Sequence, residues 1–139
     1  MEGYEDQGFD DEDAIYAEED RVNGITGRII GCAITVSKEL GPGYLESVYE
    51  NALVLELRRA ELEADPQQEL VVLYKGEPVG DFRADVVVEN VVLLELKAAR
   101  AIEDVHIAQA LNYLKTTGMR YALILNFGTP KLGIKRLRR

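Results

Sequence analysis

Apolar side chains in the first half of the chain recur at the spacing of helices. From Ile25 to Leu40 they are three or four residues apart, which places them in one stripe on a helix, and Gly41-Pro42-Gly43 ends that helix. A second stripe follows and fades near residues 64–66; its members are Leu45, Val48, Ala52 and Leu55. The pattern predicts two consecutive helices.

Strand-like patterns then replace the helical spacing. Residues 69–74 are rich in Val and Leu, and Lys75-Gly76 after them is typical of a tight hairpin turn. The later segments predict a second hairpin at 81–89 and 91–98, a helix at 102–117 closed by Gly118, a buried strand at 121–127 and an edge strand at 133–139. This order predicts an α/β sandwich with a central mixed β-sheet flanked by helices.

The second hairpin decides which side chains can meet. On its first strand Phe82, Ala84, Val86 and Val88 are expected to share one face, with Asp85 on the other. On its second strand the apolar face is expected to lie opposite Glu95 and Lys97. Directly opposed residues share a face, so Asp85, Glu95 and Lys97 lie together only if the loop has an odd number of residues or a bulge. We therefore predict a three-residue connection with Asn90 in the left-handed conformation.

Composition is that of one globular domain. The chain has 139 residues, of which 47% are hydrophobic and 29% charged. Cys32 is the single cysteine, so an internal disulfide and a cysteine-based metal cage are excluded, and a cytoplasmic location is expected. Neither a signal peptide nor an apolar run long enough to span a membrane is expected.

The formal net charge of −9 is unevenly distributed. Residues 1–20 contain ten of the 25 acidic residues and none of the 16 basic ones, so the rest of the chain is close to neutral. We expect residues 1–20 to be a disordered acidic tail and residues 21–139 to be the folded domain. The tail is interpreted as solubilising; the alternative is a mimic of phosphate charge that covers a basic groove. Because the C-terminus is locally basic, a nucleic-acid partner remains compatible with the global charge.

Two carboxylates and a lysine on one strand surface favour a metal site. Asp85 and Glu95 repel each other on adjacent strands, and a divalent cation would remove that cost. Mg²⁺ commonly takes one or two carboxylates together with water and substrate phosphate. Lys97 would then orient a water molecule or stabilise charge on the attacked phosphate. A salt-bridged patch, with Lys97 paired to either carboxylate, explains the hairpin alone equally well.

Other polar residues support the metal site. Glu46 begins the second helix and is a candidate third acidic ligand, with Tyr49 and Glu50 one turn further on. On the later helix His106, Gln109 and Tyr113 form a stripe distinct from the apolar one. Taken singly, each of these residues is more often structural than catalytic.

Several motifs resemble a known family. Gly43-Tyr-Leu-Glu46-Ser-Val-Tyr49 matches the GxxExxY pattern, which names a family of small bacterial proteins. Asp85, followed ten residues later by Glu95-Leu96-Lys97, resembles the core of the PD-(D/E)XK nuclease superfamily. Segments 109–114, 123–128 and 133–136 also look like this family, and the resemblance covers about residues 22–139.

The resemblance implies a restriction-endonuclease-like fold and metal-dependent phosphodiester hydrolysis of nucleic acid, DNA in particular. It implies Asp85 and Glu95 as ligands of Mg²⁺ or Mn²⁺ and Lys97 as the catalytic lysine. It further implies Glu46 as a helix carboxylate near the metal and Gln109 as a supporting active-site residue. Many nucleases of this fold pair up to cut both strands, so a homodimer is expected. One departure is Thr35-Val36-Ser37, where members often carry Glu-Val-His.

Two other functions stay open at this stage. One is a protein-assembly or nucleic-acid-binding module that keeps the nuclease fold without turnover, since fold does not fix function. The other is an accessory protein that binds nucleic acid through its basic C-terminus, for which binding would depend strongly on salt.

Overall fold

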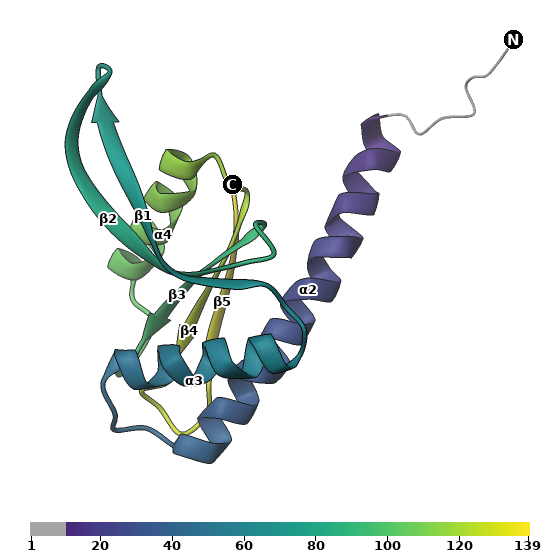
Figure 1. The fold of residues 1–139 in the computed structure, drawn as a ribbon, viewed down its shortest axis with the longest axis vertical. Helices are drawn as coiled ribbons and strands as arrows, with labels where there is room; N and C mark the ends of the chain where they lie inside the picture. Colours follow the sequence, from purple (N-terminus) through teal and green to yellow (C-terminus); the bar gives the residue numbers. More distant parts are fainter. Residues whose placement is uncertain (1–10) are drawn as a thin grey trace, which may run out of the picture.

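One five-stranded mixed sheet forms the centre of the molecule (Figure 1). The structure, a computed structural model, describes residues 11–139. Strands β1 (Ala64–Tyr74), β2 (Glu77–Val88), β3 (Val92–Lys97), β4 (Tyr121–Asn126) and β5 (Gly133–Arg138) are neighbours in that order. β3 and β4 are parallel because helix α4 (Asp104–Thr117) connects them, and the other pairs are antiparallel. The predicted restriction-endonuclease-like α/β fold is confirmed.

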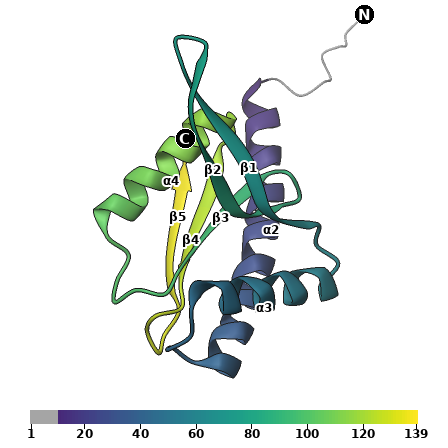
Figure 2. The ribbon, with the colours of Figure 1, turned by 60° about the vertical axis from the view of Figure 1, so that its left-hand side comes forward.

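Helices cover both faces of the sheet (Figure 2). Helices α2 (Asp11–Leu40) and α3 (Glu46–Arg59) pack on one face, against Val86, Val88, Leu94 and Leu96. Helix α4 packs on the other face through Ala110 and Leu114, which contact a cluster containing Val87, Leu93 and Ile124. No helix among residues 11–139 is long and apolar enough to cross a membrane.

Helix α2 begins earlier than the apolar stripe indicated. Residues 11–20 were expected to belong to a disordered tail, but they form the first turns of α2. Acidic side chains suit the N-terminal end of a helix. Two of them also form ion pairs across the sheet edge: Glu18 with Arg120 at 2.8 Å, and Glu19 with Arg138. Residues 1–10 lie outside the described part of the chain.

The loop between β2 and β3 has the predicted length. Val88 is opposite Val92, so the connection is Glu89-Asn90-Val91, and Asn90 has φ 56°. Val86 is opposite Leu94, and continuing this register places Asp85 opposite Glu95. The turn at Lys75-Gly76 and the end of α4 at Gly118 are also confirmed.

The prediction that four apolar residues of β2 share one face is correct for only two of them. Val86 and Val88 lie on the face of α2 and α3, but Ala84 belongs to the α4 cluster, and Phe82 stacks on Tyr113 of α4. On β1, Gln67 lies between the partners of Ala84 and Val86 and has φ 55°. The alternation of faces along β2 is therefore interrupted between Ala84 and Val86. The β1–β2 pair curves away from the rest of the sheet (Figure 1).

Candidate functional site

Asp85 and Glu95 lie side by side on neighbouring strands. Glu95 and Lys97 alternate with Leu94 and Leu96, which face α2 and α3, so both polar side chains are on the α4 face. The Asp85 carboxylate accepts a hydrogen bond from the Leu96 N–H at 2.7 Å. The structure thus brings together the three residues that the hairpin pattern predicted.

Burial makes the pair of carboxylates costly to ionise. Glu95 is only 4% exposed, and its Oε1 atom has no hydrogen-bond partner. Burial, and secondarily the charge of Asp85, raises the pKa of Glu95 from 4.5 to about 8, while Lys97 acts in the opposite direction. Burial also raises the pKa of Asp85 from 3.8 to about 6, against the Leu96 hydrogen bond. One proton or one cation is needed to hold the pair at neutral pH.

The unpaired Glu95 oxygen fits a cation ligand. A buried polar atom without a partner costs free energy, and a bound divalent ion would recover it. Within residues 11–139, no group of three or more acidic, histidine or cysteine side chains is arranged to hold a metal. The donor set therefore fits Mg²⁺ held by two carboxylates, water and substrate phosphate, and not an ion enclosed by protein ligands alone.

Glu46 lies close to the pair but is bonded to the backbone. It is the first residue of α3, and its Oε2 accepts a hydrogen bond from the Ala98 N–H at 3.3 Å. Its charge contributes to the raised pKa of both Asp85 and Glu95. Glu50, one turn later, is hydrogen-bonded by Gln67 at 2.8 and 2.9 Å. Glu46 is thus beside the site without completing a metal cluster.

Tyr49 is structural. Its buried ring stacks on Phe127 at 4.8 Å, and its hydroxyl donates to the Gly41 carbonyl at 2.6 Å and accepts from the Tyr44 N–H at 3.1 Å. These contacts fix the loop between α2 and α3. The tyrosine of the Gly43–Tyr49 motif therefore sets the position from which Glu46 reaches Ala98.

Tyr113 is a residue of α4 whose pKa is affected by the two carboxylates. Burial, and then the charges of Glu95 and Asp85, raise its pKa. Gln109 lies one turn earlier on the same helix face but is exposed, and within residues 11–139 no hydrogen bond joins it to the carboxylates. His106 caps the helix, because its Nδ1 accepts a hydrogen bond from the Glu103 N–H at 3.0 Å.

Asn126 is a residue that the sequence patterns did not single out. It is 2% exposed and lies opposite Lys97. Its Oδ1 accepts from the Ala99 N–H at 2.9 Å and the Gly128 N–H at 3.1 Å, and its Nδ2 donates to the Ala99 carbonyl at 2.9 Å. In the sequence, the only indication of its role is that a polar residue stands near the end of the apolar segment 121–127. Asn126 holds the segment that follows Lys97, and a Cβ on Gly128 would meet that backbone at 2.2 Å.

Replacing Asn126 with alanine is expected to destabilise the fold by about 2 to 3 kcal/mol, because the part-buried Ala99 backbone groups lose their partners. Urea unfolding measures the change. Asn112→Ala removes an exposed amide from α4 and is the matched control, with an expected change within about 0.5 kcal/mol. Equal losses in the two variants would contradict the role given to Asn126.

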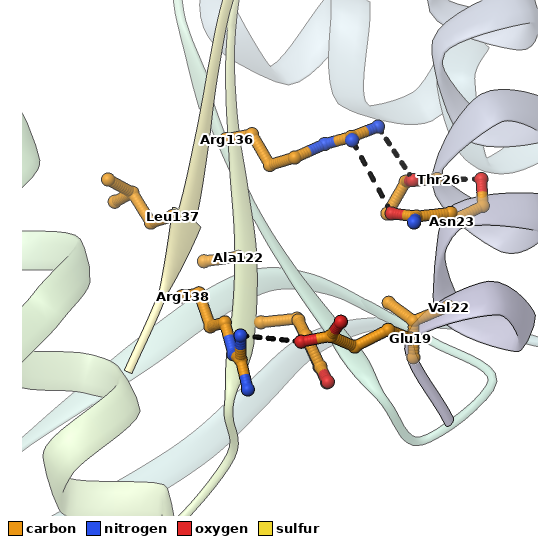
Figure 3. A pocket seen from close by; sticks show the side chains of 9 residues that line it. Glu19, Val22, Asn23, Thr26, Ala122, Arg136, Leu137 and Arg138 are labelled. Carbon is orange, nitrogen blue, oxygen red and sulfur yellow. Dashed lines mark hydrogen bonds and ion pairs between the residues drawn. The ribbon is translucent and has the colours of Figure 1, made fainter. Parts of the chain in front are cut away.

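A separate hollow lies between α2 and strands β4 and β5 (Figure 3). It has a volume of about 220 Å³, and its arginines are engaged: Arg138 with Glu19, and Arg136 with Thr26 at 2.9 Å. These contacts are with α2, on the sheet face opposite Glu95. The described part of the acidic segment therefore does not cover the carboxylate pair.

Comparison with known proteins identifies the family of this chain. A sequence model of the PD-(D/E)XK nuclease superfamily matches residues 23–137. The chain belongs to the PD-(D/E)XK nuclease superfamily. Proteins of this superfamily are generally nucleases, and they typically use divalent metals such as Mg²⁺. Asp85, Glu95 and Lys97 lie within the matched residues.

The structural comparison supports the fold alone. The chain is similar to a protein of known structure, described as "Crystal structure of SSO0001", with a TM-score of 0.52 and 15% sequence identity. The similarity covers 67% of this chain and 49% of that chain, so the PD-(D/E)XK chain spans about half the length of that relative. No curated protein matches the sequence.

Proposed function

We propose that this PD-(D/E)XK protein hydrolyses phosphodiester bonds of nucleic acid, DNA in particular, with Mg²⁺ or Mn²⁺. The observation that carries the proposal is the buried Glu95 oxygen without a partner, beside Asp85 and on the strand face that also holds Lys97. A structural salt bridge would leave no such atom unpaired. The superfamily match supports the same chemistry.

In the proposed mechanism, Asp85 and Glu95 hold the metal, with Glu46 as a further carboxylate beside them. The ion would supply Lewis-acid stabilisation of the charge that develops on the phosphate. Lys97 orients the attacking water or stabilises the developing charge with its ammonium group. Gln109, one turn before Tyr113, is proposed as a supporting active-site residue.

The narrower family assignment is also part of the proposal. Gly43, Glu46 and Tyr49 fit the GxxExxY family, and the contacts of Tyr49 give this spacing a physical role. Ser37 is a departure, since members often carry a histidine there; it is buried in this chain. We also propose a cytoplasmic bacterial protein that acts as a homodimer.

A substrate panel tests the proposed function. Supercoiled plasmid, single-stranded DNA and single-stranded RNA are each incubated with the full chain in Mg²⁺, in Mn²⁺ or in EDTA. We expect cleavage of DNA with metal and none in EDTA. Well-folded protein that cleaves none of these substrates with either metal would overturn the proposal.

A binding module is the second candidate. Fold does not fix function, and a nuclease fold can serve binding without turnover. In that case the panel would show retention of nucleic acid without products, with an affinity that falls steeply as salt increases.

A further inference from the structure

The tip of the β1–β2 hairpin presents an apolar edge. β1 is the first strand of the sheet, so one side of it has no neighbouring strand within residues 11–139. Its last five residues, 70–74, are Leu-Val-Val-Leu-Tyr and carry no charge. Val71, Leu73 and Tyr74 are 53%, 60% and 62% exposed. The hairpin projects beyond the rest of the sheet in both ribbon views (Figures 1 and 2).

The opposite edge of the same sheet is protected. β5 has six residues, compared with 11 in β1, and three of the six are basic: Lys135, Arg136 and Arg138. Two of these reach α2 through Thr26 and Glu19. Short length and charge are the usual means of preventing edge-to-edge pairing. The outer part of β1 has neither, so its exposed edge is a template for another strand.

The irregularity in the hairpin leaves the outer edge of β1 regular. Val72 is opposite Gly80, but the next residue, Leu73, is opposite Pro78. The extra residue, Val79, is therefore on β2, and β1 continues without an insertion. A bulge on β1 itself would have turned the edge away from a partner strand.

The sequence of this edge is complementary to itself. Antiparallel pairing of two copies about Val72 places Leu70 against Tyr74 and Val71 against Leu73. The same register brings Glu69 of each copy near Lys75 of the other, the turn residue that follows β1, so the apolar centre is flanked by opposite charges at both ends. Two copies related by a two-fold axis present the same surface to each other, so that surface must be complementary to itself. The register centred on Val72 meets this requirement.

We propose that two copies of this chain pair through β1, antiparallel and centred on Val72. The inference rests on the homodimer of the proposed function and names its interface, which is a surface away from the carboxylate pair. The test needs neither metal nor nucleic acid, so its failure is distinguishable from failure of the nuclease proposal.

Light scattering on the full chain during size-exclusion chromatography, over a range of loading concentrations, tests this pairing. We expect wild type to be a dimer and Leu73→Glu to raise the dimer dissociation constant at least about 30-fold, since each copy would bury a charge. Val79→Glu adds the same charge to the extra residue of β2 and is expected to leave the dimer intact. Monomeric wild type, a dimer that survives Leu73→Glu, or equal disruption by Val79→Glu would overturn the proposal.

A charge exchange tests the register. Glu69→Lys and Lys75→Glu each create like charges across the proposed axis, and each is expected to weaken the dimer about 5- to 10-fold. The double variant restores opposite charges and is expected to recover most of the affinity. A double variant that associates no better than the single ones would overturn pairing about Val72. Circular dichroism confirms that each variant is folded.

Discussion

The Glu95→Gln variant is expected to be more stable than wild type at pH 8 and to lose metal-dependent cleavage. An amide at position 95 resembles the protonated acid and carries no charge into the buried site. It also weakens a metal ligand. If the variant is more stable but inactive, the buried charge of Glu95 destabilises the fold and is required for activity.

The sign of the pH dependence follows from the raised pKa values. Because the folded-state pKa of Glu95 is about 8, against an ordinary value of 4.5, the folded protein binds more protons than the unfolded chain between these pH values. The free energy of unfolding therefore falls as pH rises from about 4.5 to about 8, and Asp85 acts in the same direction up to about 6. The Glu95→Gln variant lacks the part of this decrease in the free energy of unfolding that Glu95 contributes.

Thermal unfolding at pH 5 and pH 8, with and without Mg²⁺, measures the effect. At pH 8 without metal, Glu95→Gln is expected to gain on the order of 2 kcal/mol, a Tm higher by about 5 °C. Mg²⁺ is expected to raise the Tm of wild type more at pH 8 than at pH 5, and to raise that of the variant little. Glu39→Gln, at an exposed position near the end of α2, is the control and is expected to change neither quantity. A variant whose Tm falls as steeply with pH as wild type would contradict the account.

Removal of the Lys97 side chain beyond Cβ is expected to lower the rate of DNA cleavage at least about 10³-fold. The ammonium group is the donor that the proposed mechanism assigns to the attacking water or the developing charge, and such donors commonly contribute factors of this size. Affinity for DNA is expected to change much less, so the loss lies in kcat and not in KM.

Lys135→Ala provides the matched control for Lys97→Ala. It removes the same charge from an exposed position on β5 and leaves the carboxylate pair unchanged. Its cleavage rate is expected to stay within about threefold of wild type, consistent with a small electrostatic effect on binding. If the cleavage rate fell equally in the two variants, Lys97 would be only one of several positive charges that attract DNA.

The hairpin shows how far sequence patterns can define a site. Two-residue alternation, together with the rule that opposed residues share a face, predicted both the three-residue loop and the meeting of Asp85 with Glu95. Both features depend only on local strand geometry, and β2 and β3 have this geometry around residues 86–94. The prediction failed for Phe82 and Ala84, which lie on the α4 side, so the alternation of faces along β2 is interrupted between residues 84 and 86.

The remaining differences come from contacts between distant segments. Residues 11–20 look like a solvated tail in sequence, but α2 continues through them and Glu18 and Glu19 meet arginines more than 100 residues away. The role of Asn126 depends on Ala99, 27 residues earlier. His106 shares a polar stripe with Gln109 in the sequence, and its ring caps α4 by accepting from the Glu103 N–H. The spacing of apolar residues along the chain does not predict contacts between such distant residues.

The most direct test of the central claim is the rate of DNA cleavage as a function of Mg²⁺ concentration, measured for wild type and Lys97→Ala under identical conditions. For wild type we expect a saturable rise from no cleavage in EDTA, and for the folded variant no measurable rise. Cleavage that persists in EDTA, or that Lys97→Ala retains, would show that Asp85, Glu95 and Lys97 do not form the hydrolytic site.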